Sequence, residues 1–337
     1  MKFQVSHKPQ EGYNIRKSRQ ANFTSVCLTF CLAFIGSESA FGVSNVDAQP
    51  AFEKPITVGI LNHKNLTEVS GAARSFHQPD HIWAINDSGD APSLHLVSHD
   101  GKPVASINIS ELANFDWEDI DSFEVNGKPY LAIGDIGDNL NRRKVYYVHI
   151  LPEPEMTFDI QGNPKLNLKP SDIQTIGFQF EDGARDSESI AVDPENKAVY
   201  ILSKRDKPAR LYRLPLMMAP ERIVYKASFI QEVEELAGIS PIHFGSMVQT
   251  FLSYMPTSMS TFEDEVAVLT YGYVHLFHQN ATSKQKFWSW QKSMPLPRMP
   301  QAEALSYIEG GHLLVFSEQV PSPIVRFSRQ PLHNNSE

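Results

Sequence analysis

The stretch Ser187-Glu188-Ser189-Ile190, followed by Ala198-Val199-Tyr200-Ile201-Leu202-Ser203-Lys204, decides the fold. Its second part is an apolar run of strand length that ends in a small and a polar residue, and its first part is a strand opened by a glutamate. A third run at Leu211-Tyr212 and a fourth from Ile223 to Ile230 follow. Asp, Pro and Asn residues separate the first two runs, so the pattern predicts consecutive short strands joined by turns.

The same unit recurs along residues 56–330. Apolar second strands end at residues 86, 134, 203, 270 and 317, and the successive steps are 48, 69, 67 and 47 residues. A period near fifty with four strands in each unit is typical of a β-propeller. The longer steps fit insertions around 152–171 and 233–251. The sequence therefore predicts an all-β protein, a β-propeller of five four-stranded blades, or of six if residues 233–251 conceal a degenerate blade.

The two ends of the repeat region complement each other. The last unit lacks a fourth strand, and the run Ile56-Thr57-Val58-Gly59-Ile60 precedes the first unit. We expect this N-terminal strand to close the ring, because closure removes a sheet edge that would otherwise invite aggregation. An irregular β-sandwich with accidental similarity between its units is the alternative.

The N-terminal segment has the pattern of a signal peptide. A basic stretch precedes an apolar run from Phe23 to Gly36, and small residues follow. This run is shorter than the roughly 20 residues that span a bilayer. We expect residues 1–48 to be a signal peptide, residues 49–332 to form the propeller domain and residues 333–337 to be a C-terminal tail. An uncleaved membrane anchor is the alternative.

Composition limits the location and the partners. Cys27 and Cys31 are the two cysteines of the chain, and both lie in the predicted signal peptide, so the mature protein would have no disulfide and no thiolate metal site. We expect a periplasmic or secreted protein with no stable membrane span after signal cleavage. The formal net charge of -9 argues against nucleic acid as a partner, because binding phosphates requires a basic surface.

Glutamates open the first strand in four of the five units, at Glu68, Glu118, Glu188 and Glu303. The first strand of each propeller blade lines the central axis, so we expect these side chains to converge. Converging carboxylates repel one another and need a cation, protons or basic partners. Ca²⁺ is the favoured cation because it accepts several oxygen ligands in loose geometry, and Mg²⁺ is the alternative.

Three acidic clusters support this prediction of a cation site. They are Asn86-Asp87-Ser88-Gly89-Asp90, Asp116-Trp117-Glu118-Asp119 and Gly134-Asp135-Ile136-Gly137-Asp138-Asn139. Such loops can bind a cation through side-chain and backbone oxygens, although they do not match an EF-hand. Alternatively, the Asp and Asn side chains cap tight turns. The candidate metal ligands are Glu68, Asp87, Asp116, Asp119, Asp135, Asp138 and Glu303.

Basic residues are expected at the same level of the propeller, at Arg142 and Lys204. They either neutralise the carboxylates in ion pairs or hold an anionic group of a ligand beside the cation. In the second interpretation, the candidate ligand-binding residues are Arg142, Lys204, Asn86 and Asn139. Glu118 and Glu188 are then the candidate catalytic acids, because a carboxylate beside a cation can activate water.

Several of these motifs together resemble a known family. The strings that carry the resemblance are Trp83 to Asp90, Asp116 to Ile120, Gly134 to Asn139, Asp186 to Ile190, Ser203-Lys204 and Gln301 to Leu305. In this order they resemble exported bacterial β-propellers of the phytase-like type, also described as "esterase-like activity of phytase" proteins, over about residues 60–328. The resemblance implies a propeller whose acidic rim binds calcium and acts on phosphate or ester bonds. The fourth unit departs from it, since Thr257-Ser258-Met259-Ser260 contains no acid, and phytate hydrolysis is not expected.

Two functions follow from these residues. The first is a metal-dependent hydrolase of a phosphoric or carboxylic ester, with a small anionic substrate. The second is a non-catalytic propeller that has a structural cation and binds a protein, a glycan or another cell-envelope component. No Gly-x-Ser-x-Gly or His-Glu-x-x-His motif is present, so the sequence does not favour a nucleophilic serine or a zinc protease. The two functions differ in whether the glutamates keep open coordination positions or are closed off by Arg142 and Lys204.

Overall fold

The computed structural model describes residues 51–236, 252–280 and 286–331. These residues form strands β1 to β22 and the short 3-10 helices η1 (Pro170–Asp172), η2 (Glu234–Leu236) and η3 (Glu309–Gly311). The predicted signal peptide, the C-terminal tail and most of the insertion at 233–251 lie outside the described residues. In the described part of the chain, no helix is both long enough and apolar enough to cross a membrane.

Three of the sheets have four strands each, and all their neighbouring strands are antiparallel. The first contains β2 (Val69–Arg74), β3 (His81–Asn86), β4 (Ser93–Ser98) and β5 (Pro103–Asn108). The second contains β16 (Pro256–Phe262), β17 (Glu265–Thr270), β18 (Tyr273–Gln279) and β19 (Trp288–Pro295). The third contains β20 (Ala302–Ile308), β21 (His312–Ser317), β22 (Ser322–Phe327) and β1 (Ile56–Leu61).

An eight-stranded sheet contains the middle of the chain. One half consists of β6 (Trp117–Val125), β7 (Lys128–Asp135), β8 (Tyr146–Pro152) and β11 (Gln174–Phe180), and the other of β12 (Ser187–Asp193), β13 (Ala198–Ser203), β14 (Ala209–Pro215) and β15 (Val224–Val233). The halves join where the outer strands β11 and β15 pair in parallel, with Phe178 opposite Tyr225. Within each half the strands are antiparallel and follow the order of the sequence repeat.

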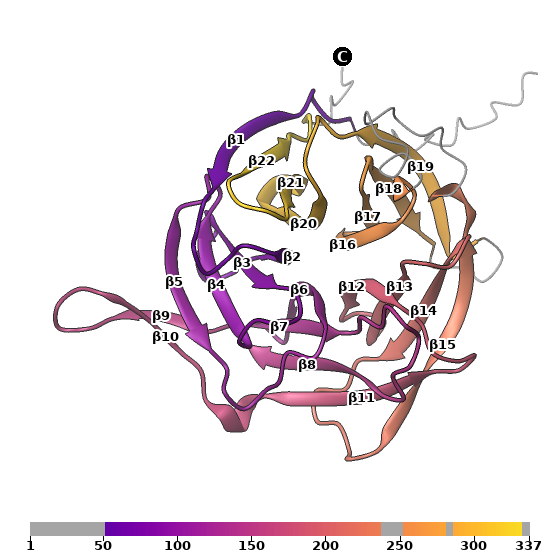
Figure 1. Cartoon of the computed structure of the whole chain (residues 1–337), viewed down its shortest axis with the longest axis horizontal. Coiled ribbons are helices and arrows are strands. Elements are labelled where there is room, and N and C mark those ends of the chain that lie inside the picture. Colours follow the sequence, from indigo (N-terminus) through magenta and orange to yellow (C-terminus); the bar gives the residue numbers. More distant parts are fainter. Residues whose placement is uncertain (1–50, 237–251, 281–285, 332–337) are drawn as a thin grey trace, which may run out of the picture. The chain divides into compact units, whose positions relative to one another are not determined.

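The insertion after β8 forms a two-stranded hairpin of β9 (Glu155–Phe158) and β10 (Pro164–Asn167), which projects from the sheets in Figure 1. The N-terminal strand β1 pairs with β22, with Ile56 opposite Arg326. The prediction that this strand completes the last sheet is therefore confirmed.

The inner strands form a closed ring. Each of β2, β6, β12, β16 and β20 contacts the next, and β20 contacts β2, so the sheets surround one axis (Figure 1). On β2, a Cβ added to Gly71 would lie 2.8 Å from the Cα of Asp119 on β6, so these strands approach each other closely. A sandwich of two stacked sheets does not have this ring, and the arrangement is that of a β-propeller.

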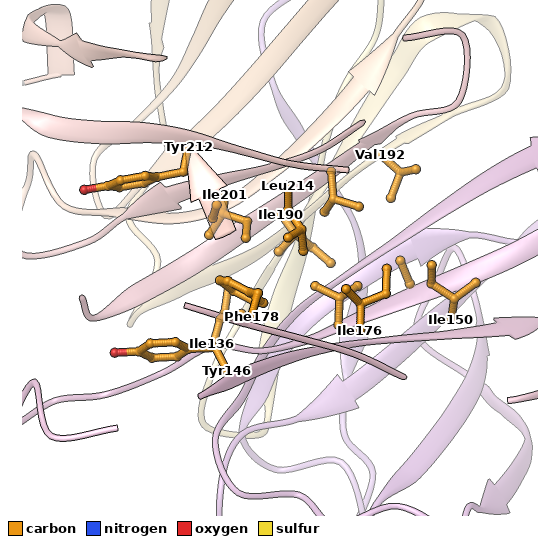
Figure 2. Packing of buried hydrophobic residues seen from close by; sticks show 14 of the residues in the cluster. Ile136, Tyr146, Ile150, Ile176, Phe178, Ile190, Val192, Ile201, Tyr212 and Leu214 are labelled. Atoms are coloured by element: carbon orange, nitrogen blue, oxygen red, sulfur yellow. The ribbon is translucent and has the colours of Figure 1, made fainter. Parts of the chain in front are cut away.

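Packing between neighbouring sheets explains why the second strands are apolar throughout. On β13, Val199 and Ile201 pack with Tyr146 and Phe178 in the cluster shown in Figure 2. The alternate residues Ala198, Tyr200 and Leu202 pack on the opposite face, against the β16–β19 sheet. Both faces of the strand are buried, so each large apolar side chain contributes about 1.5–3 kcal/mol of burial free energy. A polar side chain without a hydrogen-bond partner would be costly on either face.

Candidate functional site

Each inner strand carries one irregularity near its beginning. The register with the second strand shifts around a single residue on each of the five inner strands, and these residues are Ser70, Glu118, Glu188, Thr257 and Glu303. A β-bulge leaves one residue unpaired and changes the direction of its side chain. The repeated bulge therefore gives Glu118, Glu188 and Glu303 equivalent positions around the axis. We call the residues at this end of the inner strands the rim.

The register corrects the predicted position of Glu68. Ser70, not Glu68, is the bulged residue of β2, and Glu68 corresponds to Asp116 and Asp186, each two residues before a bulge. The backbone carbonyls of these three acids accept equivalent hydrogen bonds from the residues that follow the second strands, at 3.0 Å from Asp87, 3.1 Å from Ile136 and 2.9 Å from Lys204. Glu68 itself is exposed.

The two bulge positions without an acid connect neighbouring strands. The Ser70 hydroxyl donates to the carbonyl of Trp117 at 3.1 Å, and the Thr257 hydroxyl donates to the carbonyl of Ala302 at 2.8 Å. In both cases the acceptor belongs to the beginning of the next inner strand. These short side chains therefore stabilise the ring, and the bulge carboxylates lie on the adjacent strands β6 and β12 and, separately, on β20.

Three predicted site residues come together on the rim. One carboxylate oxygen from each of Asp87, Asp116 and Glu118 lies within 4.8 Å of the other two. Glu118 is only 5% exposed, and its carboxylate forms no hydrogen bond or ion pair with any residue in the described part of the chain. A buried carboxylate without a donor is costly, so this group requires protons or a cation.

The loop after β7 covers two of these carboxylates closely. The backbone NH of Gly137 donates to the carbonyl of Asp116 at 3.2 Å. A Cβ added to Gly137 would overlap the Oε1 atom of Glu118 and would lie 2.5 Å from the Oδ2 atom of Asp116. Only glycine leaves the space between this loop and the carboxylates open.

The pKa of each of these three carboxylates is raised above its ordinary value. Burial raises the pKa of Asp116 to about 6, and the neighbouring Asp87 adds to this shift. Burial also raises the pKa of Glu118 well above its ordinary value, with repulsion from Glu188 and Asp87 as further causes. Burial raises the pKa of Asp87 in the same way. A partly buried, all-oxygen donor set with repelling charges fits a hard divalent cation such as Ca²⁺ or Mg²⁺.

A second part of the rim is neutralised by the chain itself. Lys204, directly after β13, is buried, and its Nζ atom forms an ion pair with Glu188. The same atom lies 5.3 Å from the centre of the Tyr271 ring, and the Tyr271 hydroxyl donates to Glu303 at 2.7 Å. Burial raises the pKa of Glu303, and the charge of Lys204 opposes this shift. Glu188 and Glu303 are therefore not part of the group of three carboxylates.

Asp135 and Asp138 stabilise their own loop. Asp135 forms an ion pair with Arg143, with 2.7 Å between Oδ1 and NH1. Asp138 accepts hydrogen bonds of 2.8 Å from the backbone NH groups of Arg142 and Arg143 and from the Tyr146 hydroxyl. Burial opposes ionisation of Asp138, but these hydrogen bonds outweigh it, and the pKa of Asp138 lies below its ordinary value. The structure does not bring either residue into the group of three.

Asp119 is fully buried and fully hydrogen-bonded. Its carboxylate accepts hydrogen bonds from the backbone NH groups of Ile190 at 2.9 Å and Met259 at 3.2 Å, and from the Ser258 hydroxyl at 3.0 Å. Its pKa lies well above the ordinary value because burial outweighs these bonds. We therefore assign Asp119 to the stability of the ring and not to the cation site.

The remaining predicted residues differ in their surroundings. The Asn86 amide donates to the carbonyl of Asn65 at 3.1 Å and accepts from the backbone NH of Glu68 at 3.3 Å. The Asn139 side chain accepts a hydrogen bond from Arg205. The side chain of Arg142 is exposed and forms no hydrogen bond or ion pair with the described residues.

The sequence prediction did not assign four residues that contribute to the rim. Gly137 covers the carboxylates, Asp186 forms an ion pair with Arg205, and Tyr271 binds Glu303. Burial raises the pKa of Glu318 to about 7, with the charge of Glu303 as the next cause. Tyr271 and Glu318 follow the second strands at the position that Lys204 occupies, so alignment of the repeat units could have found them.

Comparison with known proteins shows distant structural similarity. No protein family model matches the chain, and no curated protein sequence matches it. The PQQ-bound aldose sugar dehydrogenase from Streptomyces coelicolor has a TM-score of 0.43 at 7% identity, covering 83% of this chain and 100% of that chain. A luciferin-regenerating enzyme has a TM-score of 0.41 at 9% identity, covering 82% and 95%. The apo form of the soluble aldose sugar dehydrogenase from Escherichia coli has a TM-score of 0.42 at 9% identity, covering 82% and 99%. These values say nothing about the reaction of this chain, and the class of protein, an all-β propeller with an acidic rim, rests on the strand pairing and the rim described above.

Proposed function

We propose that this protein is an exported, metal-dependent hydrolase of phosphoric or carboxylic esters, built on a propeller of five four-stranded blades. Asp87, Asp116 and Glu118 hold the cation, which is Ca²⁺ or, alternatively, Mg²⁺. The observation that carries the proposal is the buried Glu118 carboxylate, which has no donor in the described part of the chain and lies beside two further carboxylates. The five inner strands support the blade count, and the N-terminal sequence supports a periplasmic or secreted location.

Each residue of the rim has a separate role in the proposed hydrolysis. A bound divalent cation supplies positive charge that polarises a scissile ester group. Glu188 is the residue that we assign to proton transfer, because burial raises its pKa well above the ordinary value while Lys204 opposes the shift. Lys204 keeps Glu188 in place through their ion pair. The exposed guanidinium of Arg142 is available to bind an anionic substrate group.

One observation favours a second function. The ion pair of Lys204 with Glu188 and the hydrogen bond of Tyr271 with Glu303 neutralise part of the rim without any ligand. A rim that is largely paired internally is typical of a structural role. In this alternative the cation stabilises a non-catalytic propeller, which binds a protein or glycan partner.

Metal analysis and enzyme assays distinguish these functions. The mature chain, residues 49–337, is purified, its metal content is measured, and a panel of phosphomonoesters and carboxylic esters is assayed with and without chelator. We expect turnover that chelation abolishes and that Glu118→Gln reduces at least tenfold. Glu124→Gln, an exposed position of the same strand, is the matched control. Cation binding without turnover would favour the non-catalytic function, and absence of both would overturn the proposal.

A further inference from the structure

An open cavity adjoins the cation group. It has a volume of about 530 Å³, and its lining includes Phe115, Asp116, Leu140, Arg142 and Tyr147. Asp116 belongs to both the cavity and the group of three carboxylates. The volume falls in the range of small-molecule sites, roughly 300–1,000 Å³.

One part of the cavity wall is apolar and exposed. Phe115 is 65% exposed and Leu140 is 66% exposed, and the ring centres of Phe115 and Tyr147 are 6.4 Å apart. The backbone NH of Phe115 donates to the carboxylate of Asp135 at 3.3 Å, so Phe115 has a defined position beside the rim. Large apolar side chains that are exposed together around one cavity are typical of a binding site.

The same wall carries an unpaired positive charge. Arg143 forms an ion pair with Asp135, and its guanidinium donates to the carbonyl of Gly137 at 2.9 Å. Its neighbour Arg142 is anchored only through its backbone, by Asp138, and its guanidinium pairs with nothing in the described part of the chain. The cavity therefore combines an apolar wall with a free guanidinium and with Asp116, one of the three carboxylates of the proposed cation site.

We propose that this cavity binds the aromatic group of an anionic phosphate ester. The phosphate lies at the end of the cavity that holds Asp116 and Arg142, and the aromatic group lies against Phe115, Leu140 and Tyr147. This inference rests on the proposed function, because it names the substrate class of the same site. The inference predicts that the cavity binds aryl phosphates more tightly than small phosphates that have no apolar group.

Binding of two non-hydrolysable probes tests the inference. Phenylphosphonate and methylphosphonate are titrated calorimetrically into the mature chain, each with and without Ca²⁺. We expect phenylphosphonate to bind about tenfold more tightly, because its ring transfers apolar surface from water to the cavity wall. Phe115→Ala should reduce this preference to less than threefold, and Arg142→Gln should weaken both probes to the same extent.

Phe158→Ala is the matched control, because Phe158 is 64% exposed at the end of strand β9 and does not line the cavity. It should leave the preference unchanged. Equal affinity for the two phosphonates, or a preference that Phe115→Ala leaves intact, would overturn the inference. A separate titration with Ca²⁺ alone tests the cation site, so failure of the proposed function is seen independently of the probe preference.

Discussion

The carboxylate of Asp119 accepts a hydrogen bond from the Ser258 hydroxyl at 3.0 Å, although the two residues are 139 positions apart in the chain. The same carboxylate binds the backbone NH groups of Ile190 and Met259, so one side chain links β6 with β12 and β16. Ser258 in turn accepts from the backbone NH of Leu305 on β20 at 3.1 Å. One polar network thus joins the four inner strands β6, β12, β16 and β20, which surround the axis in Figure 1.

This network predicts a large cost for Asp119→Ala. The substitution removes this acceptor from the buried backbone NH groups of Ile120, Ile190 and Met259, and each buried NH group left unsatisfied costs about 1–3 kcal/mol. We expect the free energy of unfolding to fall by about 2–5 kcal/mol in urea titrations. Asp264→Ala, at an exposed position, should change it by less than about 0.5 kcal/mol. A loss below about 1 kcal/mol in Asp119→Ala would show that the network contributes little.

The close approach of Gly137 to the rim gives a second prediction. Gly137→Ala places a methyl group where it overlaps the Glu118 carboxylate, so the carboxylates must move apart. We expect cation affinity to fall at least tenfold while the circular dichroism spectrum is retained. In the control Gly177→Ala, the added Cβ lies 3.5 Å from the nearest atom, an ordinary contact, and affinity should be unchanged. Equal affinities in both variants would exclude Gly137 from the site.

Lys204→Met tests the neutralised part of the rim. The substitution removes the buried partner of Glu188, and breaking a buried ion pair costs about 3–5 kcal/mol. Protonation of Glu188 and Glu303 can replace the lost charge, so the destabilisation should be larger at pH 8 than at pH 5. The double variant Lys204→Met/Glu188→Gln should recover part of the loss. If the second substitution restores nothing in thermal unfolding, the two side chains are not coupled.

The raised pKa of Glu318 predicts a pH dependence. Its pKa of about 7 in the folded chain exceeds the ordinary value of 4.5, so the folded protein holds a proton that the unfolded chain releases. The stability from this group is present below about pH 4.5 and is lost as the pH rises through 7. Buried histidines whose pKa lies near 4, such as His149, act in the opposite direction below pH 6.5. The difference in free energy of unfolding between Glu318→Gln and wild type isolates the contribution of Glu318. In the presence of chelator, this difference should grow in favour of Glu318→Gln between pH 5 and pH 8. A difference that stays constant over this range would contradict the assignment.

The repeat predicted the fold because burial acts on every unit in the same way. Strands such as β13 are covered on both faces, which requires the continuous apolar runs that the sequence displays. The position of Glu68 was predicted incorrectly: the bulged residue of β2 is Ser70, and Glu68 lies two residues earlier, at the position of Asp116 and Asp186. The sequence of one strand does not show which residue forms the bulge. Asp119 looked like a ligand because most of its donors are backbone NH groups, and two of these, from Ile190 and Met259, are distant in sequence. Local sequence cannot show which backbone groups will surround a carboxylate.

The most direct test of the cation site is calorimetric titration of CaCl₂ into the mature chain after removal of metals with chelator. We expect one binding site in each chain, with an affinity that falls at least tenfold in Glu118→Gln and in Asp116→Asn, and that is unchanged in the exposed-position control Glu124→Gln. Absence of binding to the wild-type chain by both Ca²⁺ and Mg²⁺, or binding that survives Glu118→Gln undiminished, would contradict the account.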